Sequence, residues 1–308
     1  DERYILKLFR KLESGINPDV EIGQALAEQQ FEGTVPKMHA ILTYKHEGQA
    51  FTYGVIHRYL DGAKTAWDVL LEHLKAAVQV QEPQSSAALE PACQMASALG
   101  TLTARMHTLL ANAAGPDFAA EGWTASEREL LSTSQAEYSA KQIALLRERF
   151  TQLPADTQPL AKLVIDGQQK LLARFAAWKS IQDCGQRIRI HGDYHLGQVL
   201  VTLRSNDSAK HDYWAIDFEG EPARPLAERR RKRSPLQDVA GMIRSLHYAV
   251  SQTRLSHAAN ASGNSWAAAA YPQLVTAFIT AYDAELKVDG LLPAPHSDDR
   301  QKMLDLFI

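Results

Sequence analysis

The stretch His191-Gly-Asp-Tyr-His-Leu-Gly-Gln198 decides how this chain is interpreted, because it gathers a carboxylate, an amide and two imidazoles in one short segment. Asp193 precedes Gln198 by five residues. A second polar segment, Asp217-Phe-Glu-Gly-Glu221, begins nineteen residues after Gln198, at the end of an apolar run that predicts a strand. Carboxylates and other oxygen groups are the ligands that a hard divalent ion prefers. The two segments therefore predict a loop and a strand end that meet around such an ion.

The spacing of these groups is typical of a phosphoryl-transfer site. Kinase catalytic loops place an aspartate five residues before an amide side chain, and a D-F-x segment follows. In this interpretation Asp193 accepts a hydrogen bond from the attacking hydroxyl and takes its proton, while Gln198 and Asp217 bind Mg²⁺. Glu219 and Glu221 either assist or hold the loop by hydrogen bonds.

The two histidines of the first segment have different expected roles. His191 ties the loop to the core, and His195 contacts a substrate hydroxyl or packs. A rival interpretation uses the alternation of His191, Asp193 and His195, which on an extended strand would share one face and form the metal site of a hydrolase. The two glycines of the segment favour a loop instead.

A lysine inside an apolar strand is the second informative feature. The run Tyr4 to Phe9 predicts a strand, and burying the ammonium of Lys7 without a partner would cost several kcal/mol. Kinases place such a lysine on a strand, where it reaches the nucleotide phosphates and pairs with a helix glutamate. Asn17 and Pro18 predict the start of a helix. Glu21, in its first turn, is the expected partner of Lys7.

The order of elements predicts a two-lobed α+β protein. A strand, a helix and a strand pair over 35–44 and 50–59 come first, and most of the remaining chain has helical periodicity. A hairpin over 199–203 and 213–218 carries the two polar segments. We expect a partial N-terminal lobe over residues 1–60 and a mostly helical C-terminal lobe over 61–308.

The composition excludes several classes of function. The chain has 308 residues and a net charge of -3, so neither nucleic acid nor an anionic membrane is an expected partner. No apolar run approaches the roughly 18 residues that a membrane helix needs. Cys93 and Cys184 are too few for a disulfide scaffold, which favours a cytoplasmic location.

A basic run, Arg229-Arg-Arg-Lys-Arg233, is the one segment that resembles a nucleic-acid patch. Glu228 precedes it, and no aromatic residues are interleaved. We therefore expect a solvated loop near the phosphate region, oriented by Asp238 and Arg244 on the following helix.

The segment 191–198 and the stretches 4–23 and 214–246 resemble bacterial maltokinases, including the maltokinase domains fused to trehalose synthase. The resemblance extends over nearly the whole chain. It implies an aminoglycoside-phosphotransferase-like fold of the eukaryotic protein kinase type, with ATP and Mg²⁺ as cofactors. It also implies phosphorylation of maltose at its anomeric hydroxyl, which gives maltose 1-phosphate for α-glucan synthesis.

The resemblance also implies a role for individual residues. Segment 56–62 corresponds to the hinge that receives adenine through backbone groups. The resemblance implies Asp193 as the catalytic residue, Gln198 and Asp217 as metal ligands, and Lys7, Glu21, His57 and Tyr59 as nucleotide-binding residues. Beside it, we expect His195 and Arg244 to be sugar-binding residues.

The ends of the chain depart from this family. Its members have a cap region and further strands before the lysine strand, and a Tyr- and Glu-rich helix after the counterpart of 304–307. We therefore expect an incomplete N-terminal lobe with an unpaired sheet edge, in a fragment of a larger protein. Two alternatives stay open: a kinase of another small alcohol, such as an aminoglycoside or choline, and an inactive kinase-like module of a fusion protein.

Overall fold

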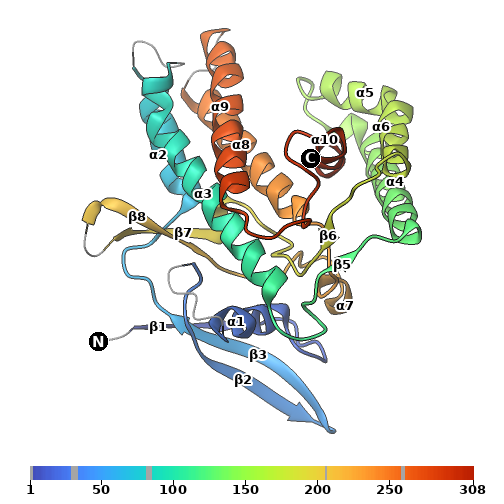
Figure 1. The fold of residues 1–308 in the computed structure, drawn as a ribbon. Helices are drawn as coiled ribbons and strands as arrows, with labels where there is room; N and C mark the ends of the chain where they lie inside the picture. The colour runs from blue at the N-terminus through green and yellow to red at the C-terminus, as the bar shows by residue number, and fades with distance from the viewer. Residues whose placement is uncertain (1–2, 29–33, 81–84, 205–206, 258–260) are drawn as a thin grey trace.

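The computed structural model describes residues 3–28, 34–80, 85–204, 207–257 and 261–308. A small antiparallel sheet and one helix form the N-terminal part (Figure 1). The sheet has the strand order β1-β3-β2, and the helix α1 lies against it. The bounds are β1 (Tyr4–Leu8), α1 (Pro18–Glu28), β2 (Met38–His46) and β3 (Gln49–Arg58). The predicted strand pair is confirmed, with its ends shifted by one to three residues.

The register of this sheet places Lys7 opposite Val55, in the middle of β3. Phe9, Val20 and Val55 form a separate small core between the sheet and α1. Asn17 caps α1 as predicted, because its side-chain oxygen accepts a hydrogen bond from the backbone N–H of Asp19 at 2.9 Å. The sequence therefore fixes locally where α1 begins and which side of β1 carries the lysine.

Helices make up most of the rest of the chain, and α3 and α9 lie side by side at its centre (Figure 1). Gly100 permits this close approach, because a Cβ there would lie 2.2 Å from the carbonyl oxygen of Phe278. The long helices are α2 (Ala66–Val78), α3 (Ser86–Asn112), α4 (Ala125–Glu148), α8 (Leu236–His257) and α9 (Ala261–Glu285). The shorter ones are α5 (Gln158–Asp166), α6 (Gln168–Arg174), α7 (Leu226–Arg229) and α10 (Asp298–Phe307).

A second three-stranded sheet lies beside the helices, between them and the N-terminal sheet (Figure 1). Its strands are β4 (Lys64–Thr65), β7 (Val199–Arg204) and β8 (Asp207–Ala215), in the order β4-β7-β8. The sequence predicts the hairpin β7-β8, but the second strand begins at Asp207 instead of residue 213 and ends at Ala215 instead of residue 218. Two further short strands, β5 (Glu121–Gly122) and β6 (Gln186–Arg187), pair with each other. None of the helices described is long and apolar enough to cross a bilayer.

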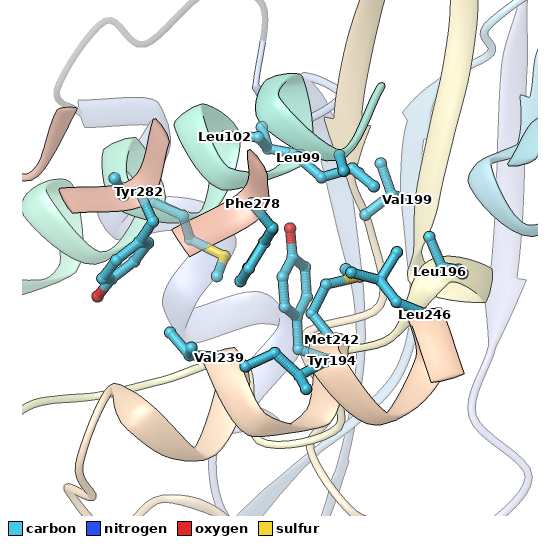
Figure 2. Close-up of a cluster of buried hydrophobic side chains, with 14 of the residues drawn as sticks. Leu99, Leu102, Tyr194, Leu196, Val199, Val239, Met242, Leu246, Phe278 and Tyr282 are labelled. Carbon is cyan, nitrogen blue, oxygen red and sulfur yellow. The ribbon is translucent and has the colours of Figure 1, made fainter. Parts of the chain in front are cut away.

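The main core reaches directly to the polar segment at 191–198. Tyr194 and Leu196 are buried among residues of α3, α8 and α9, including Leu99, Met242 and Phe278 (Figure 2). The hydroxyl of Tyr194 meets that of Thr103 at 3.1 Å inside this core. Since burying such side chains stabilises a fold by about 1.5–3 kcal/mol each, the loop is anchored through alternate residues.

Candidate active site

The loop at 191–198 is held from one side by a single buried carboxylate. Asp238 accepts hydrogen bonds from the backbone N–H groups of His191 and Gly192, at 2.8 and 2.9 Å. It also lies 3.2 Å from Nε2 of His107. His191 in turn donates from Nε2 to the carbonyl oxygen of Ile216 at 2.9 Å, which joins the loop to the end of β8. His191 therefore ties the loop to the core, as expected.

These contacts correct the expected role of Asp238. Sequence patterning suggested that it orients the basic run, but both of its carboxylate oxygens are bonded to the loop that carries Asp193. Asp193 itself is partly buried between the anchored neighbours. Burial raises its pKa above the ordinary value, while the nearby His195 acts in the opposite direction. A carboxylate in such a place is suited to accept a hydrogen bond from a hydroxyl.

Gln198 and Asp217 lie side by side, as predicted. The backbone N–H of Ile216 donates to the carbonyl oxygen of Gln198 at 3.0 Å, and Nε2 of Gln198 donates to Oδ2 of Asp217 at 3.2 Å. Asp217 has a φ of 67°, the left-handed region that non-glycine residues seldom adopt. Backbone strain of this kind is commonly found at functional sites.

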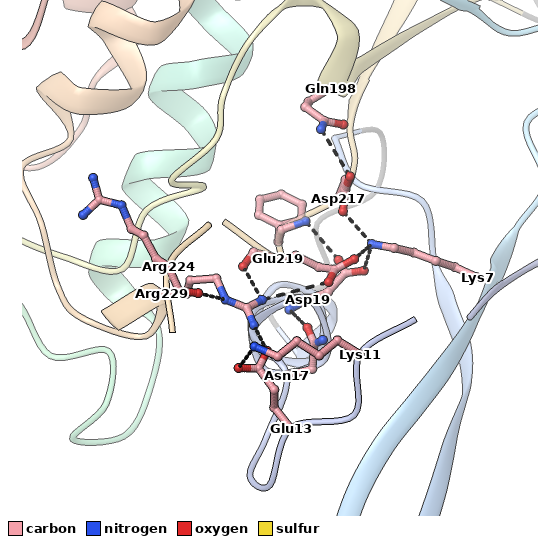
Figure 3. Close-up of polar contacts among 11 residues, drawn as sticks. Lys7, Lys11, Glu13, Asn17, Asp19, Gln198, Asp217, Glu219, Arg224 and Arg229 are labelled. Atoms are coloured by element: carbon pink, nitrogen blue, oxygen red, sulfur yellow. Dashed lines mark hydrogen bonds and ion pairs between the residues drawn. The ribbon is translucent and has the colours of Figure 1, made fainter. Parts of the chain in front are cut away.

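The ammonium of Lys7 lies among three carboxylates (Figure 3). Its Nζ is 2.8 Å from Oδ2 of Asp19, 2.5 Å from Oδ1 of Asp217 and 2.6 Å from Oε1 of Glu219. Burial alone would lower the pKa of Lys7, but the charges of Asp19 and Asp217 outweigh it and raise the pKa. Burial likewise acts to raise the pKa of Asp217, and Lys7 reverses this and lowers it. The ion pair between Lys7 and Asp217 thus holds β1 against the segment that follows β8.

Asp19 takes the place that the sequence assigned to Glu21. The two residues lie two apart in α1, so their side chains point about 200° apart around the helix axis, and only one can face β1. Asp19 faces Lys7 and also accepts from the backbone N–H of Phe218 at 3.0 Å. The predicted contact between Lys7 and Glu21 is wrong.

Glu21 instead joins two arginines of the C-terminal part. It accepts from Arg189 at 2.7 Å and from Arg230 through two hydrogen bonds, at 2.7 and 3.0 Å. Arg189 is only 1% exposed. This triad fixes α1 against the C-terminal part of the chain, and any contact of Glu21 with nucleotide stays a prediction.

The expectation of a solvated basic run is wrong for several of its side chains. Arg229 pairs with Glu13 and donates to the carbonyl oxygen of Glu219 at 3.2 Å (Figure 3). Lys232 pairs with Glu121 at 2.6 Å. Sequence separation hides these pairs, since an acidic partner more than a hundred residues away gives no local signal.

The acid cluster fits a divalent ion. Asp19, Asp217 and Glu219 each offer an oxygen, and these oxygens all lie within 4.8 Å of one another. Such oxygen ligands suit Mg²⁺, which is commonly bound through one or two carboxylates. The amide of Gln198 adds an oxygen when its two ends are exchanged, an assignment that rests on hydrogen bonding alone. Asp19 was not predicted as a metal ligand, and Glu219 was expected only to assist or to hold the loop by hydrogen bonds.

The two hinge residues lie at the end of β3. Nδ1 of His57 lies 3.4 Å from the carbonyl oxygen of Pro36. The backbone N–H of Tyr59 is already bonded to the carbonyl oxygen of Arg3 at 2.8 Å, so this group is not available to adenine. Adenine contacts through the other backbone groups stay a prediction.

The two proposed sugar residues each come directly before one of the two residues that join the loop to α8. His195 accepts from the backbone N–H of Gly197 at 3.0 Å, which orients its ring. The hydroxyl oxygen of Ser245 accepts a hydrogen bond from the backbone N–H of Leu196 at 3.1 Å. Arg244 is the neighbour of Ser245 on α8. Arg244 is exposed and donates to the hydroxyl of Tyr248 at 3.2 Å, away from the basic run that it was expected to orient. Sugar contacts of both residues stay predictions.

The chain belongs to the phosphotransferase enzyme family (APH), whose model matches residues 1–220. Among curated proteins it is similar to a glucosamine kinase of Streptacidiphilus jiangxiensis, with 28% identity over 276 residues, which is 86% of this chain and 53% of that protein. A glucosamine kinase of Mycolicibacterium smegmatis (strain ATCC 700084 / mc(2)155) is 28% identical over 293 residues, which cover 93% of this chain and 64% of that protein. The chain thus spans between about half and two thirds of the length of these relatives.

The same class of fold is found among solved structures. A glucosamine kinase in complex with glucosamine, ADP and inorganic phosphate matches with a TM-score of 0.71 and 24% identity, over 99% of this chain and 65% of that one. A glucosamine kinase in crystal form B also matches with a TM-score of 0.71 and 24% identity, over 100% of this chain and 70% of that one. The predicted α+β, kinase-like fold of the aminoglycoside phosphotransferase type is therefore confirmed. The resemblance to maltokinase in particular is not shown by these comparisons.

Proposed function

We propose that this chain carries the phosphoryl-transfer site of a sugar kinase, which moves the terminal phosphoryl group of ATP to a sugar hydroxyl. The main support is the direct contact of Lys7 on β1 with Asp217 at the end of β8, beside the loop that presents Asp193. A lysine for the phosphates, a carboxylate for the metal and a second carboxylate for the hydroxyl are the parts that this reaction needs. The names of the curated relatives support a sugar as the acceptor.

Each group has one task in this reaction. Asp193 orients the acceptor hydroxyl and accepts its proton. Lys7 donates to phosphate oxygens in place of one of its present carboxylate partners. Asp217, Glu219 and Gln198 would hold Mg²⁺. When bound, Mg²⁺ neutralises charge on the phosphates and so stabilises the transition state.

We propose maltose as the acceptor and maltose 1-phosphate as the product, with Asp193 facing the anomeric hydroxyl. The support is the resemblance of the stretches 4–23, 191–198 and 214–246 to maltokinases. On the same grounds we propose a fusion to trehalose synthase and a role in α-glucan synthesis. The two cysteines are free thiols, which fits a reducing cytoplasm.

Glucosamine is the second candidate acceptor, because both curated relatives described above are named glucosamine kinases. An assay of ADP release by the full-length protein, with maltose, glucosamine, choline and an aminoglycoside as acceptors, decides between them. We expect the highest kcat/KM with maltose, and ³¹P NMR of the product identifies the hydroxyl that is phosphorylated. Faster turnover of glucosamine overturns the maltose assignment but keeps the sugar kinase.

The reaction itself is tested through Asp193. Asp193→Ala is expected to abolish acceptor-dependent ADP release while Mg²⁺-dependent ATP binding is retained. Unchanged turnover would remove Asp193 from the reaction. Failure of the unmodified full-length protein to bind ATP with Mg²⁺ would instead favour an inactive module that stabilises a fused partner.

A further inference from the structure

A small cavity of about 50 Å³ lies beside the catalytic loop and apart from the Lys7 cluster. Gly192 of the catalytic loop lines it, together with Glu221 and three arginines of the following segment, Arg224, Arg229 and Arg233. Lys7, Asp19, Asp217 and Glu219 do not line it. The cavity therefore adjoins the phosphoryl-transfer site without sharing these four residues, and the roles proposed above leave its arginines without a function.

Two glycines keep the cavity free of side chains on one wall. Gly192 and Gly220 both line it, with φ values of 81° and 70° that favour glycine. A Cβ on Gly192 would lie 3.4 Å from Cα of Gly220. Bare backbone at this wall lets a ligand approach closely.

The three arginines of the cavity differ in how closely an acidic side chain approaches their positive charge. Arg229 is paired with Glu13. Arg224 comes no nearer than 4.0 Å to a carboxylate oxygen of Glu228. Arg233 donates to the carbonyl oxygen of Glu228 at 3.2 Å, and no acidic side chain of the described segments forms an ion pair with it. Burial, together with the nearby Arg224, lowers the pKa of Arg233 to about 10. Arg224 and Arg233 therefore line the cavity without a hydrogen-bonded acidic side chain in the part of the chain that the structure describes.

Glu221 lines the same cavity but forms no ion pair with these arginines in the part of the chain that the structure describes. Its charge acts on Asp193 as well, whose pKa it helps to raise after the larger effect of burial. A carboxylate that lines a site rich in arginine, yet stays unpaired, offers an acceptor for a ligand that also carries a proton.

We propose that this cavity binds a protonated phosphate group, with Arg224 and Arg233 donating to its charged oxygens and Glu221 accepting from its P–OH. Guanidinium groups form strong, directional hydrogen bonds with phosphate oxygens. Sulfate at neutral pH has the charge but no proton, so Glu221 repels it. The cavity is therefore selective for phosphate over sulfate. The group is either inorganic phosphate or a monoester carried by a sugar.

The test uses the full-length protein without nucleotide, so its result does not depend on kinase activity. Inorganic phosphate, and separately sulfate at equal ionic strength, is titrated by calorimetry at pH 6. We expect Arg224→Gln to weaken phosphate binding by about ten-fold or more, since one charge-assisted hydrogen bond is lost. Arg231→Gln removes the same charge from an exposed residue that does not line the cavity, and leaves the affinity within about two-fold.

The role of Glu221 has its own variant. Glu221→Gln is expected to raise the affinity for sulfate and to reduce the preference for phosphate by about ten-fold. Equal affinity of the unmodified protein for the two anions overturns the proposal. Equal losses in Arg224→Gln and Arg231→Gln overturn it as well, because general electrostatics would then explain the binding.

Two further comparisons locate the site and its natural ligand. Phosphate binding that is lost in Lys7→Met but kept in Arg224→Gln belongs to the nucleotide site and overturns the proposal. A sugar phosphate that binds more tightly than inorganic phosphate at pH 6, and loses affinity as its monoester deprotonates near pH 6–7, identifies a sugar-borne group. Tighter binding of inorganic phosphate that persists at pH 8 identifies the free ion, because that ion retains a proton there.

Discussion

Lys7 and Asp19 form an ion pair, with 2.8 Å between Nζ and Oδ2, in the position that kinase patterning assigns to Glu21. Asp19 is only 2% exposed, and its other oxygen accepts from the backbone N–H of Phe218. The carboxylate therefore links the lysine strand to the residue that follows Asp217. This relationship sets the orientation of Lys7 and gives the first prediction.

Asp19→Asn is expected to lower kcat/KM for ATP by about 10- to 100-fold, since a charge-assisted hydrogen bond to Lys7 is lost. Asparagine keeps an oxygen for the N–H of Phe218, so the fold is retained. Steady-state kinetics with varied ATP measure the effect, and Glu21→Gln is the comparison. A larger rise in KM for ATP in Glu21→Gln than in Asp19→Asn would restore the predicted pair of Lys7 and Glu21.

Glu21 is expected to matter for stability. Glu21→Gln leaves the buried guanidinium of Arg189 without its counter-charge, which costs about 3–5 kcal/mol in the free energy of unfolding. Urea denaturation measures this cost. Arg230→Gln should cost less, because Arg230 is 32% exposed and Glu21 keeps Arg189. A loss under about 1 kcal/mol in Glu21→Gln would contradict the role of the triad.

The contacts of Glu21 with Arg189 and Arg230 also predict that the stability of the protein falls in acid. Burial alone would raise the pKa of Glu21, but Arg230 and Arg189 outweigh it and lower the pKa below the ordinary value of 4.5. A carboxylate with a lowered pKa contributes its full stability at neutral pH and loses it as pH falls through the folded-state pKa. The stability of the unmodified protein should therefore fall more steeply below about pH 4.5 than that of Glu21→Gln.

The catalytic loop could be predicted from sequence because its signal is local. The spacing of Asp193 and Gln198, the glycines and the apolar run before Asp217 all lie in one hairpin and the loop that leads into it. The positions of residues around the helix axis explain why the predicted contact between Lys7 and Glu21 is wrong. Both Asp19 and Glu21 fit the first turn, and only the packing of α1 decides which of them faces β1.

Arginine partners could not be predicted for a different reason. Arg189 and Arg230 meet Glu21 across 168 and 209 residues of sequence, and Arg229 meets Glu13 across 216. Pairs of that kind depend on the folded position of the whole N-terminal part. Composition showed a basic run, but it could not show which of its charges are buried.

Glu219 is expected to contribute to metal binding. Its Oε1 lies 2.6 Å from Lys7, in the cluster whose oxygens fit Mg²⁺. Glu219→Gln should raise the Mg²⁺ concentration for half-maximal activity by about ten-fold, because one charged ligand becomes neutral. Glu228→Gln is the matched control, since its carboxylate lies outside the cluster. Equal Mg²⁺ requirements in the two variants would exclude Glu219 as a ligand.

Asp238 is expected to position the catalytic loop without touching nucleotide. Asp238→Asn places an NH₂ group against one of the N–H donors of His191 and Gly192. We expect kcat to fall about ten-fold or more and the free energy of unfolding to fall by about 1–3 kcal/mol. KM for ATP should change less than about two-fold, because the Lys7 cluster is untouched. A change in KM for ATP with kcat preserved would contradict a positioning role.

Asp193 gives the last prediction, because burial raises its pKa above the ordinary value. Its charged form accepts the hydroxyl proton, so kcat/KM should rise with pH through this raised pKa and then level off. Asp193→Asn removes the proton acceptor and should lower kcat by about 10²–10⁴-fold.

Asp193→Asn should increase the stability of the protein, although it lowers its activity. A carboxyl whose pKa is higher in the folded state than in the unfolded state costs stability once pH exceeds its ordinary value, 3.8. The neutral asparagine avoids that cost, so Asp193→Asn should unfold at a higher urea concentration than the unmodified protein at pH 7, and the difference should vanish in acid. Unfolding of the variant at a lower urea concentration would show that the charge of Asp193 supports the fold rather than the reaction.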